Sequence, residues 1–321
     1  MMLLLEVKEK IKEFYYKTKV YADIVWRFIT TAVIFLLINN QLGYNDKLSG
    51  IPVAMGLALV SAFTGTGVFV FLAGVLTIGQ VFSTSELLAA IIALVYMIMY
   101  CLVLRFNAKF SYLLVLTPIL FVLKIPYCIP LVMGIVSTPI AILPISCGVI
   151  VYYVFLVIQT TANATFGVSM EDALNIYKIV VSDVFANKEL LVNLIVFAVA
   201  VIVTYIIRRQ TFNHAFELGI VAGAISVIVG SLIGSLIFDV GNILAVILGT
   251  AASAVIAIMI WFFRSGLDYS AVERIQFEDD DYYYYVKAVP KISVTVPEKN
   301  VKRINVTKVS EAVAEEEMEG N

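Results

Sequence analysis

The chain has 321 residues, of which 61% are apolar and only 14% are charged, and its mean hydropathy is +0.96. Soluble domains carry about 25% charged residues, so this composition excludes an ordinary soluble protein and indicates a membrane protein. The net charge is −2 and no basic stripe is present, which excludes nucleic acid as a partner.

The charges are segregated along the chain. Between residues 48 and 104 the single acidic or basic side chain is Glu86, whereas residues 265–321 carry seven basic and twelve acidic side chains. We therefore predict a polytopic membrane domain over residues 21–264. A cytoplasmic tail over residues 265–308 and a disordered acidic end over residues 309–321 follow it.

Residues 1–20 are predicted to form an amphipathic helix that lies on the membrane surface. Val7, Ile11 and Phe14 share one helical face, and the lysines lie mostly on the other. Five lysines against three glutamates place this helix in the cytoplasm by the positive-inside rule. The first span, about residues 21–40, therefore runs outward.

Two apolar stretches in the middle of the chain contain breaks. Residues 51–80 include a glycine-rich TGTG sequence, and residues 110–160 hold five of the eight prolines. If both stretches fold as short legs, the chain has ten membrane segments and Arg105 and Lys109 face the cytoplasm. If both are continuous, it has eight. Ten satisfies the positive-inside rule and is the count we expect; either count places both termini inside.

The later part of the chain is bounded by cations. Arg208 and Arg209 end an apolar run, and Arg264 ends the last one, which places the tail in the cytoplasm and residues 161–189 outside. A capping box from Ser169 to Asp172 predicts an amphipathic helix in this external loop.

The expected fold is thus an all-α polytopic membrane protein with about ten membrane segments, or eight if the broken helices are continuous. Its tail is expected to form a small β-hairpin-like element. Tyrosine- and valine-rich residues before Pro290, and residues 292–296 after it, favour strands with a turn at Pro290 and Lys291.

The broken stretches are the candidate cavity region, because backbone groups freed by a break in lipid need partners inside the protein. Lys124 is the most prominent member, since ionisable residues within membrane segments are often functional. The alternative is a lysine that snorkels to the outer interface. The candidate substrate or cavity residues are Lys124, Pro126, Pro130, Ser137, Thr138, Pro139, Gly65 and Gly67.

Small residues recur every four positions in the last two apolar runs, at residues 216–238 and 241–263. Such stripes let helix backbones approach closely. We predict that the two stripes face each other in a tight antiparallel pair, which Gly230→Leu or Gly249→Leu would wedge apart. The predicted packing residues are Ala222, Ser226, Gly230, Gly234, Gly241, Ala245, Gly249 and Ser253.

Motifs for catalysis and metal binding are missing from the sequence. It has no nucleotide-binding glycine loop, no HExxH or GxSxG sequence, and no pair of carboxylates within the apolar runs. Cys101, Cys128 and Cys147 form no CxxC pair, and the single histidine, His214, cannot build a metal cluster. We therefore expect no catalytic residues, no metal site and no cofactor, and a protein that is not an enzyme.

Three blocks of sequence resemble a known family: QFEDDDYYYYVKAVPK (276–291), RFNAKFSYLLVLTPILFVLKIPYCIPLVMG (105–134) and GVIVYY (148–153). Together they resemble an uncharacterised family of multi-pass plasma-membrane proteins from anaerobic Gram-positive bacteria, whose members are often labelled transporter permeases. The resemblance covers most of the chain. It implies a bacterial plasma-membrane location and no catalytic residues.

Two functions are consistent with these features. The broken helices favour a transport or permease-like component whose substrate the sequence does not identify. The alternative is a non-transporting structural or assembly protein of the cell envelope that presents its cytoplasmic tail to a protein partner. The lipid bilayer is an expected partner in both, and homo-oligomerisation stays open.

Overall fold

The computed structural model describes residues 2–43, 45, 47–162, 182–184, 186–210, 214–238, 242–264, 273–278 and 283–288. It divides into two compact units, residues 6–265 and residues 1–5 with 266–321. The expected capping box at Ser169, the turn at Pro290 and Lys291, and the acidic end all lie outside the described residues.

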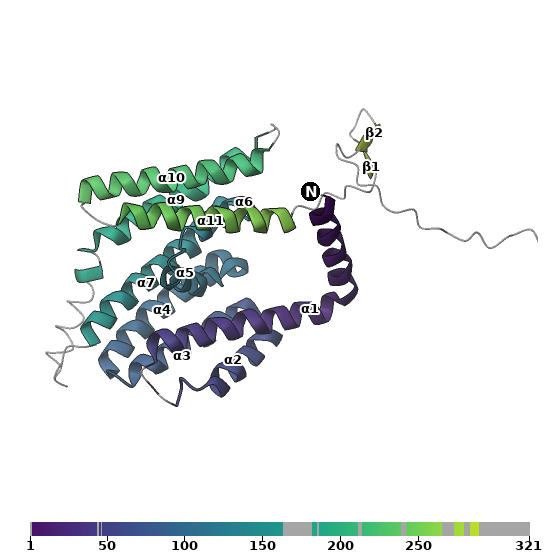
Figure 1. Ribbon diagram of the computed structural model, residues 1–321. Helices are drawn as coiled ribbons and strands as arrows, with labels where there is room; N and C mark the ends of the chain where they lie inside the picture. The colour runs from purple at the N-terminus through teal and green to yellow at the C-terminus, as the bar shows by residue number, and fades with distance from the viewer. Residues whose placement is uncertain are drawn as a thin grey trace, which may run out of the picture. The chain divides into compact units, whose positions relative to one another are not determined.

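The unit of residues 6–265 is built of helices (Figure 1). In chain order the described helices are α1 (Met2–Leu42), α2 (Ile51–Phe63), α3 (Thr66–Phe82), α4 (Glu86–Asn107), the 3₁₀ turn η1 (Ala108–Phe110), α5 (Leu113–Val122), α6 (Cys128–Val136), the 3₁₀ turn η2 (Pro139–Ala141), α7 (Ile142–Ala162), α9 (Lys188–Arg208), α10 (Ala215–Phe238) and α11 (Ile243–Arg264).

The chain is a multi-pass membrane protein. Six of the described helices, α1, α4, α7, α9, α10 and α11, include apolar stretches long enough to cross a bilayer. Large apolar side chains such as Trp26, Phe63 and Leu236 are more than two-thirds exposed on the helices. A soluble protein rarely leaves so much apolar surface uncovered, whereas lipid covers it in a membrane.

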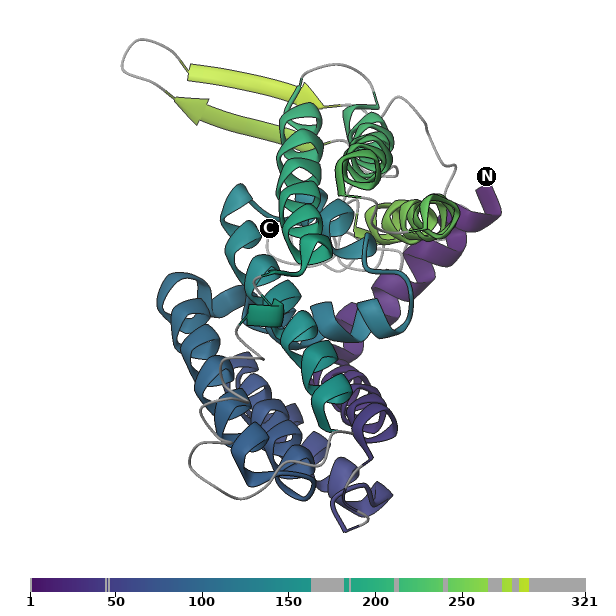
Figure 2. The same ribbon diagram turned by 90° about the vertical axis from the view of Figure 1, so that its left-hand side faces the viewer.

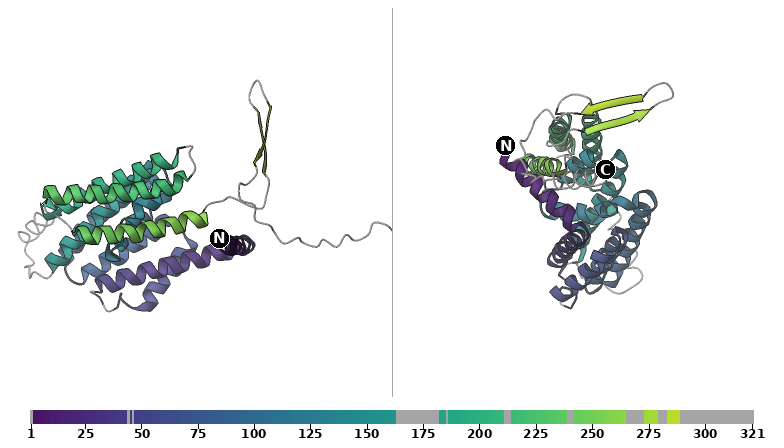
Figure 3. Two further views of the ribbon diagram at one scale, coloured as in Figure 1. Left: turned by 45° about the horizontal axis from the view of Figure 1, so that its top comes forward. Right: turned by 90° about the vertical axis from the view of Figure 1, so that its right-hand side faces the viewer.

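Helices α5, α6 and α7 lie in the middle of the helical unit. Figures 1 and 2 show α1 to α4 on one side of them and α9 to α11 on the other. The left panel of Figure 3 shows that most of the long helices run side by side. The span in α7 has the largest buried share of the six, 56%, because it has neighbours on both sides.

Helix α1 bends at Thr18, where the backbone leaves the helical region (φ −116°, ψ 17°). Figure 1 shows the N-terminal part of α1 turned away from the axis of the rest. The bend separates the part expected to lie on the membrane surface from the apolar span, which begins at Tyr21.

Helices α2 and α3 form a hairpin with a break at Thr64 and Gly65, both of which are extended. The buried side chain of Gln80, near the end of α3, joins the two ends of this hairpin to α1. Its Nε2 donates to Asn39 Oδ1 at 3.0 Å and Ser49 Oγ at 3.2 Å, and its Oε1 accepts from the Asn45 backbone N–H at 3.0 Å. The start of α2 and the end of α3 therefore lie at the same end of the unit.

The proline-rich stretch is also interrupted, and it forms three legs. Helix α5 ends before Lys124, and α6 ends before Ser137. The carbonyl oxygen of Ser137, left without a helical partner, accepts a 2.6 Å hydrogen bond from Arg208 Nη2 at the end of α9. The last leg, α7, continues to Ala162.

The most extensive helix–helix contact is between α9 and α10. Val192, Val196 and Thr204 recur on α9 at intervals of four or eight residues, and they lie against glycines of α10. A Cβ atom added at Gly234 would lie 2.5 Å from Val192 Cγ1, and one at Gly230 would lie 2.9 Å from Val196 Cγ2. The ridge of branched side chains on α9 thus fills the glycine groove of α10.

The prediction that the small-residue stripes of α10 and α11 face each other is wrong. The glycines of α10 face α9, and Gly249 of α11 faces the break before α6, where an added Cβ would lie 3.3 Å from the Lys124 carbonyl oxygen. Helices α10 and α11 meet elsewhere: Phe216 stacks on Trp261, and Ile220 and Ala224 share an apolar cluster with Ala254 and Ala257. Leucine at Gly230 would therefore separate α10 from α9.

The other predicted packing residues differ in how deeply they are buried. Ala222 and Ser226 are half-buried, and the Ser226 hydroxyl donates to the Gly223 carbonyl at 2.7 Å. Ala245 is exposed, Ser253 is buried, and Gly241 lies outside the described residues. The sequence showed which helix faces carry small residues, but it did not show that the glycine face of α10 packs against the branched residues of α9.

The tail contains an antiparallel pair of strands, β1 (Glu273–Glu278) and β2 (Tyr283–Ala288), with Glu273 opposite Ala288. The tyrosine-rich strand thus pairs with the residues before it. The strand expected at residues 292–296 lies outside the described residues.

Replacing Gln80 by leucine is expected to destabilise the membrane unit by about 2–3 kcal/mol, because a buried amide that joins three polar groups is lost. Thermal unfolding in detergent measures the change. Gln210→Leu is the matched control, since Gln210 is exposed and makes one 3.5 Å bond to Ile206. Equal effects of the two substitutions would contradict the role assigned to Gln80.

Gly223→Ala is expected to destabilise the protein by about 1–3 kcal/mol, because its Cβ would overlap Thr204 Oγ1. Thr204→Ala removes that hydroxyl, which is buried and without a hydrogen-bond partner. The double variant is therefore expected to recover most of the loss. Additive effects in the unfolding measurements would show that the two positions are not in contact.

Candidate functional site

Lys124 occupies an unusual backbone position between α5 and α6. Its φ is +60°, in the left-handed region that glycine usually occupies. Helix α5 ends through Lys124 N–H to Phe121 O and Ile125 N–H to Leu120 O, both 3.0 Å, which is a left-handed helix cap. A lysine here costs about 1–2 kcal/mol relative to a relaxed backbone.

Lys124 lines a cavity of about 260 Å³, here called the polar chamber. Five segments line this open cavity: the break between α5 and α6, the middle of α7, the start of α9, the end of α10 and the start of α11. Its charged and polar lining residues are Lys124, Tyr127, Tyr152, Tyr153, Glu189, Asn193, Ser231, Ser235 and Asn242.

Glu189 reaches the polar chamber from the first turn of α9. Asn187 caps this helix, since its Oδ1 accepts from the backbone N–H groups of Glu189 at 3.0 Å and Leu190 at 3.3 Å. A carboxylate in the first turn is also favoured by the helix dipole. Asn193 lies one turn further along the same face of α9.

The hydroxyl of Tyr153 joins these two side chains. It accepts a 2.7 Å hydrogen bond from Asn193 Nδ2 and donates to Glu189 Oε2 at 3.4 Å. Tyr153 is only 2% exposed, so its ring is fixed by packing while its hydroxyl meets the chamber. The arrangement holds Glu189 and Asn193 in place on one wall.

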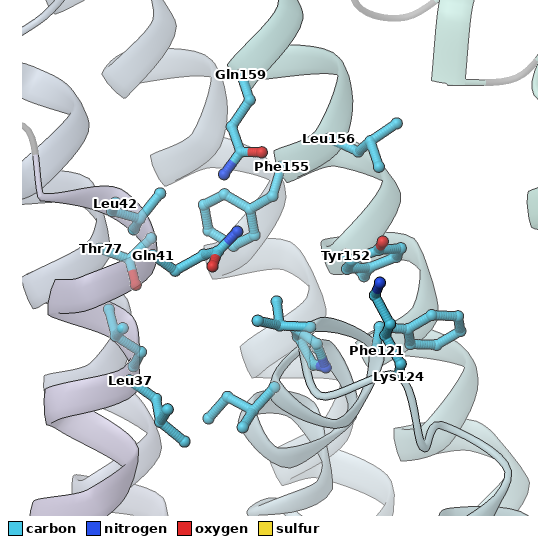
Figure 4. A pocket seen from close by; sticks show the side chains of 14 residues that line it. Leu37, Gln41, Leu42, Thr77, Phe121, Lys124, Tyr152, Phe155, Leu156 and Gln159 are labelled. Atoms are coloured by element: carbon cyan, nitrogen blue, oxygen red, sulfur yellow. The ribbon is translucent and has the colours of Figure 1, made fainter. Parts of the chain in front are cut away.

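A second cavity, of about 450 Å³, lies on the other side of Lys124 and is here called the apolar chamber. Figure 4 shows Leu37, Leu42 and Gln41 of α1 facing Phe121, Lys124 and Tyr152 across it. Most of its lining is leucine, isoleucine, valine, proline and phenylalanine. Its remaining lining residues are Gln41, Thr77, Lys124, Tyr152 and Gln159, and Lys124 is the one charged residue among those that line it.

An aromatic wall separates the two chambers. Phe121 and Tyr152 line both, and their rings are stacked with centroids 4.4 Å apart at 16°. Phe121 also stacks on Phe197 at 5.7 Å. Lys124 lines both chambers at the edge of this wall, and Figure 4 shows its amino group directed toward Tyr152.

The structure separates the residues that the sequence grouped as one cavity region. Lys124 and Pro126 line the polar chamber. Pro130 is buried inside α6, and Ser137, Thr138 and Pro139 lie at the other end of that helix, near Arg208. A single cavity region containing all of them is therefore wrong.

Gly65 and Gly67 are also far from Lys124 along the axis of the unit. Tyr100, near the end of α4, donates to the Gly67 carbonyl at 3.2 Å, so this break lies at the opposite end of α3 from Gln80. Space around Gly65 is open, with no atom within 4 Å of an added Cβ.

Several residues that line the polar chamber were not predicted from the sequence. Glu189 and Asn193 were visible as polar residues four apart at the start of an apolar run, which is helical spacing. Nothing in the sequence joined them to Lys124, which lies 65 positions earlier. Among the described residues, no group of three or more histidine, cysteine, aspartate or glutamate side chains could hold a metal ion.

Comparisons of the chain with protein-family models, with curated proteins and with solved structures found no match.

Proposed function

We propose that the protein is a transport or permease-like component of a bacterial plasma membrane, and that it binds a small polar solute in the polar chamber. The observation that carries the proposal is a chamber lined by a lysine, a glutamate and several hydroxyl and amide groups between helices of a membrane protein. Both charged side chains are exposed along the chamber, so a solute can reach them.

The backbone of Lys124 supports the same proposal. Glycine adopts a left-handed backbone without strain, yet this position is occupied by a residue with a long cationic side chain. Strain at an observed position is often associated with a binding or catalytic role.

We further propose ten membrane segments, the six long helices together with α2, α3, α5 and α6. The supporting geometry is the α2–α3 hairpin, whose two outer ends meet at Gln80. Arg105, which lies beyond Tyr100 on α4, is then at the end of the unit opposite to Lys124, as is Arg208. By the positive-inside rule this end is cytoplasmic, and both chambers lie in the outer half.

The topology has a direct test with single cysteines. In a variant without Cys101, Cys128 and Cys147, Lys109→Cys is expected to react with a membrane-impermeant maleimide only after cells are permeabilised. Lys47→Cys, in the loop after α1, is the control and should react in intact cells. Labelling of Lys109→Cys in intact cells would favour eight segments.

Lys124→Gly tests the role of the chamber apart from stability. Glycine relaxes the left-handed backbone, so the variant is expected to be about 1 kcal/mol more stable than the wild type. In proteoliposomes it should nevertheless lose uptake of a mixture of amino acids, sugars and organic acids measured by mass spectrometry. Lys188→Gly would not be a matched control, because Lys188 lies in helix α9, which glycine would destabilise.

The control is therefore Lys188→Ala, at a cation whose Nζ lies 5.8 Å from the Phe238 ring and which does not line either chamber. It should leave uptake unchanged. Unchanged uptake in Lys124→Gly would refute the assigned site, and no uptake by the wild type under any gradient would refute transport.

The alternative function is presentation of the tail to a protein partner. The paired strands β1 and β2 favour it, because a two-stranded sheet has open edges and is marginally stable alone. It would replace the transport proposal if no solute moved and a protein co-purified only when residues 266–321 were present.

A further inference from the structure

We propose that the polar chamber recognises a small zwitterion with a carboxylate and an ammonium group, such as a short amino acid. In this assignment Lys124 binds the carboxylate and Glu189 binds the ammonium group. The inference rests on the proposed function of the chamber as a solute site, and it adds the chemical class of the solute.

The two charges in the chamber are opposite and do not neutralise each other. Lys124 and Glu189 both line it, and no ion pair joins these two described residues. Both side chains are exposed along the chamber rather than buried, so a ligand can reach each of them without displacing a charged protein partner. A ligand with one charge of each sign between them would satisfy both.

The positions of the two side chains are set independently. Lys124 projects from the break between α5 and α6, whose backbone bonds do not involve α9. Glu189 is fixed by the Asn187 cap and by Tyr153. Because neither residue depends on the other for its backbone position, the fold places the two charged residues on separate parts of the chamber wall, where one ligand can contact both.

The neutral groups of the chamber suit the same class of ligand. The Tyr153 hydroxyl and the Asn193 amide stand beside Glu189, and each can hydrogen-bond an ammonium or a carboxylate group. Ser231, Ser235 and Asn242 supply further hydroxyl and amide groups from α10 and α11. A purely anionic solute would leave Glu189 opposed by a like charge, and a purely cationic solute would do the same to Lys124.

The volume favours a small ligand. The polar chamber has about 260 Å³, below the range of roughly 300–1,000 Å³ typical of pockets for drug-sized molecules. The stacked rings of Phe121 and Tyr152 close it toward the apolar chamber. A long apolar side chain would have to displace this stack, so a short or polar side chain is expected.

The experiment compares three ligands of similar size: L-alanine, propionate, which lacks the amine, and ethylamine, which lacks the carboxylate. Binding to the purified full-length protein in nanodiscs is measured by calorimetry and by the ligand-dependent rise in melting temperature. Alanine is expected to bind roughly tenfold to a hundredfold more tightly than either analogue, the usual effect of losing hydrogen bonds to a charged group.

Two variants assign the ends of the ligand. In Lys124→Met the preference for alanine over ethylamine should disappear, while the preference over propionate remains. In Glu189→Gln the reverse is expected. Lys188→Gln is the control at the neighbouring residue, and it should keep both preferences because Lys188 does not line the chamber.

Equal affinity of the wild type for alanine and propionate, or for alanine and ethylamine, would overturn the assignment in favour of a plain anion or cation site. No melting-temperature rise with any natural amino acid would overturn it as well. The failure of the transport proposal can be told apart from the failure of the zwitterion site. Binding with both preferences but without uptake would refute transport and keep the zwitterion site. Uptake of another solute class that depends on Lys124 would keep transport and refute the zwitterion site.

Discussion

The constraint on which the rest of the structure depends is that backbone polar groups inside a bilayer need partners within the protein. The break at Lys124 is closed by local backbone bonds, whereas at the breaks near Gly67 and Ser137 and in the loop at Asn45 a side chain from elsewhere supplies the partner. Arg208 donates to the Ser137 carbonyl, Tyr100 donates to the Gly67 carbonyl, and Gln80 accepts from the Asn45 amide. These contacts join segments between 33 and 71 positions apart, so the breaks tie the helices together.

The same constraint explains where the chambers are. The breaks at Gly65 and Ser137 lie at the end that carries the cations Arg105 and Arg208, and neither break lines a chamber described here. The break at Lys124 lies at the other end, where α6 begins only after several residues without regular structure. Aromatic rings rather than backbone fill the space around it, and their stacking leaves one cavity on either side. A polar and an apolar chamber thus share one lysine.

Much of the fold could be predicted because it depends on local properties of the sequence. Apolar runs set the long helices, and glycine and proline set the breaks at Gly65 and Lys124. Helix partners could not be predicted in the same way. The glycines of α10 pack on Val192 and Val196 because those branched side chains fill a groove, and a sequence shows a groove without showing which ridge enters it. Because α11 follows α10 in the chain, the sequence favoured α11 as the partner of the α10 glycines, whereas in the structure they pack on α9.

The candidate site was predictable only in part for a related reason. Lys124 was visible as a lone cation among proline breaks, but its partners in the chamber come from α7, α9, α10 and α11. The spacing of Glu189 and Asn193 indicated a polar helical face without indicating what it faces. Once α9 is held against α10 by its valine ridge, the first turn of α9 must lie beside the end of α10, and Glu189 lines the polar chamber together with Ser235 and Asn242. The packing that the sequence could not assign is therefore what assembles the chamber, and the stability of the α9–α10 pair and the affinity of the site are expected to be coupled.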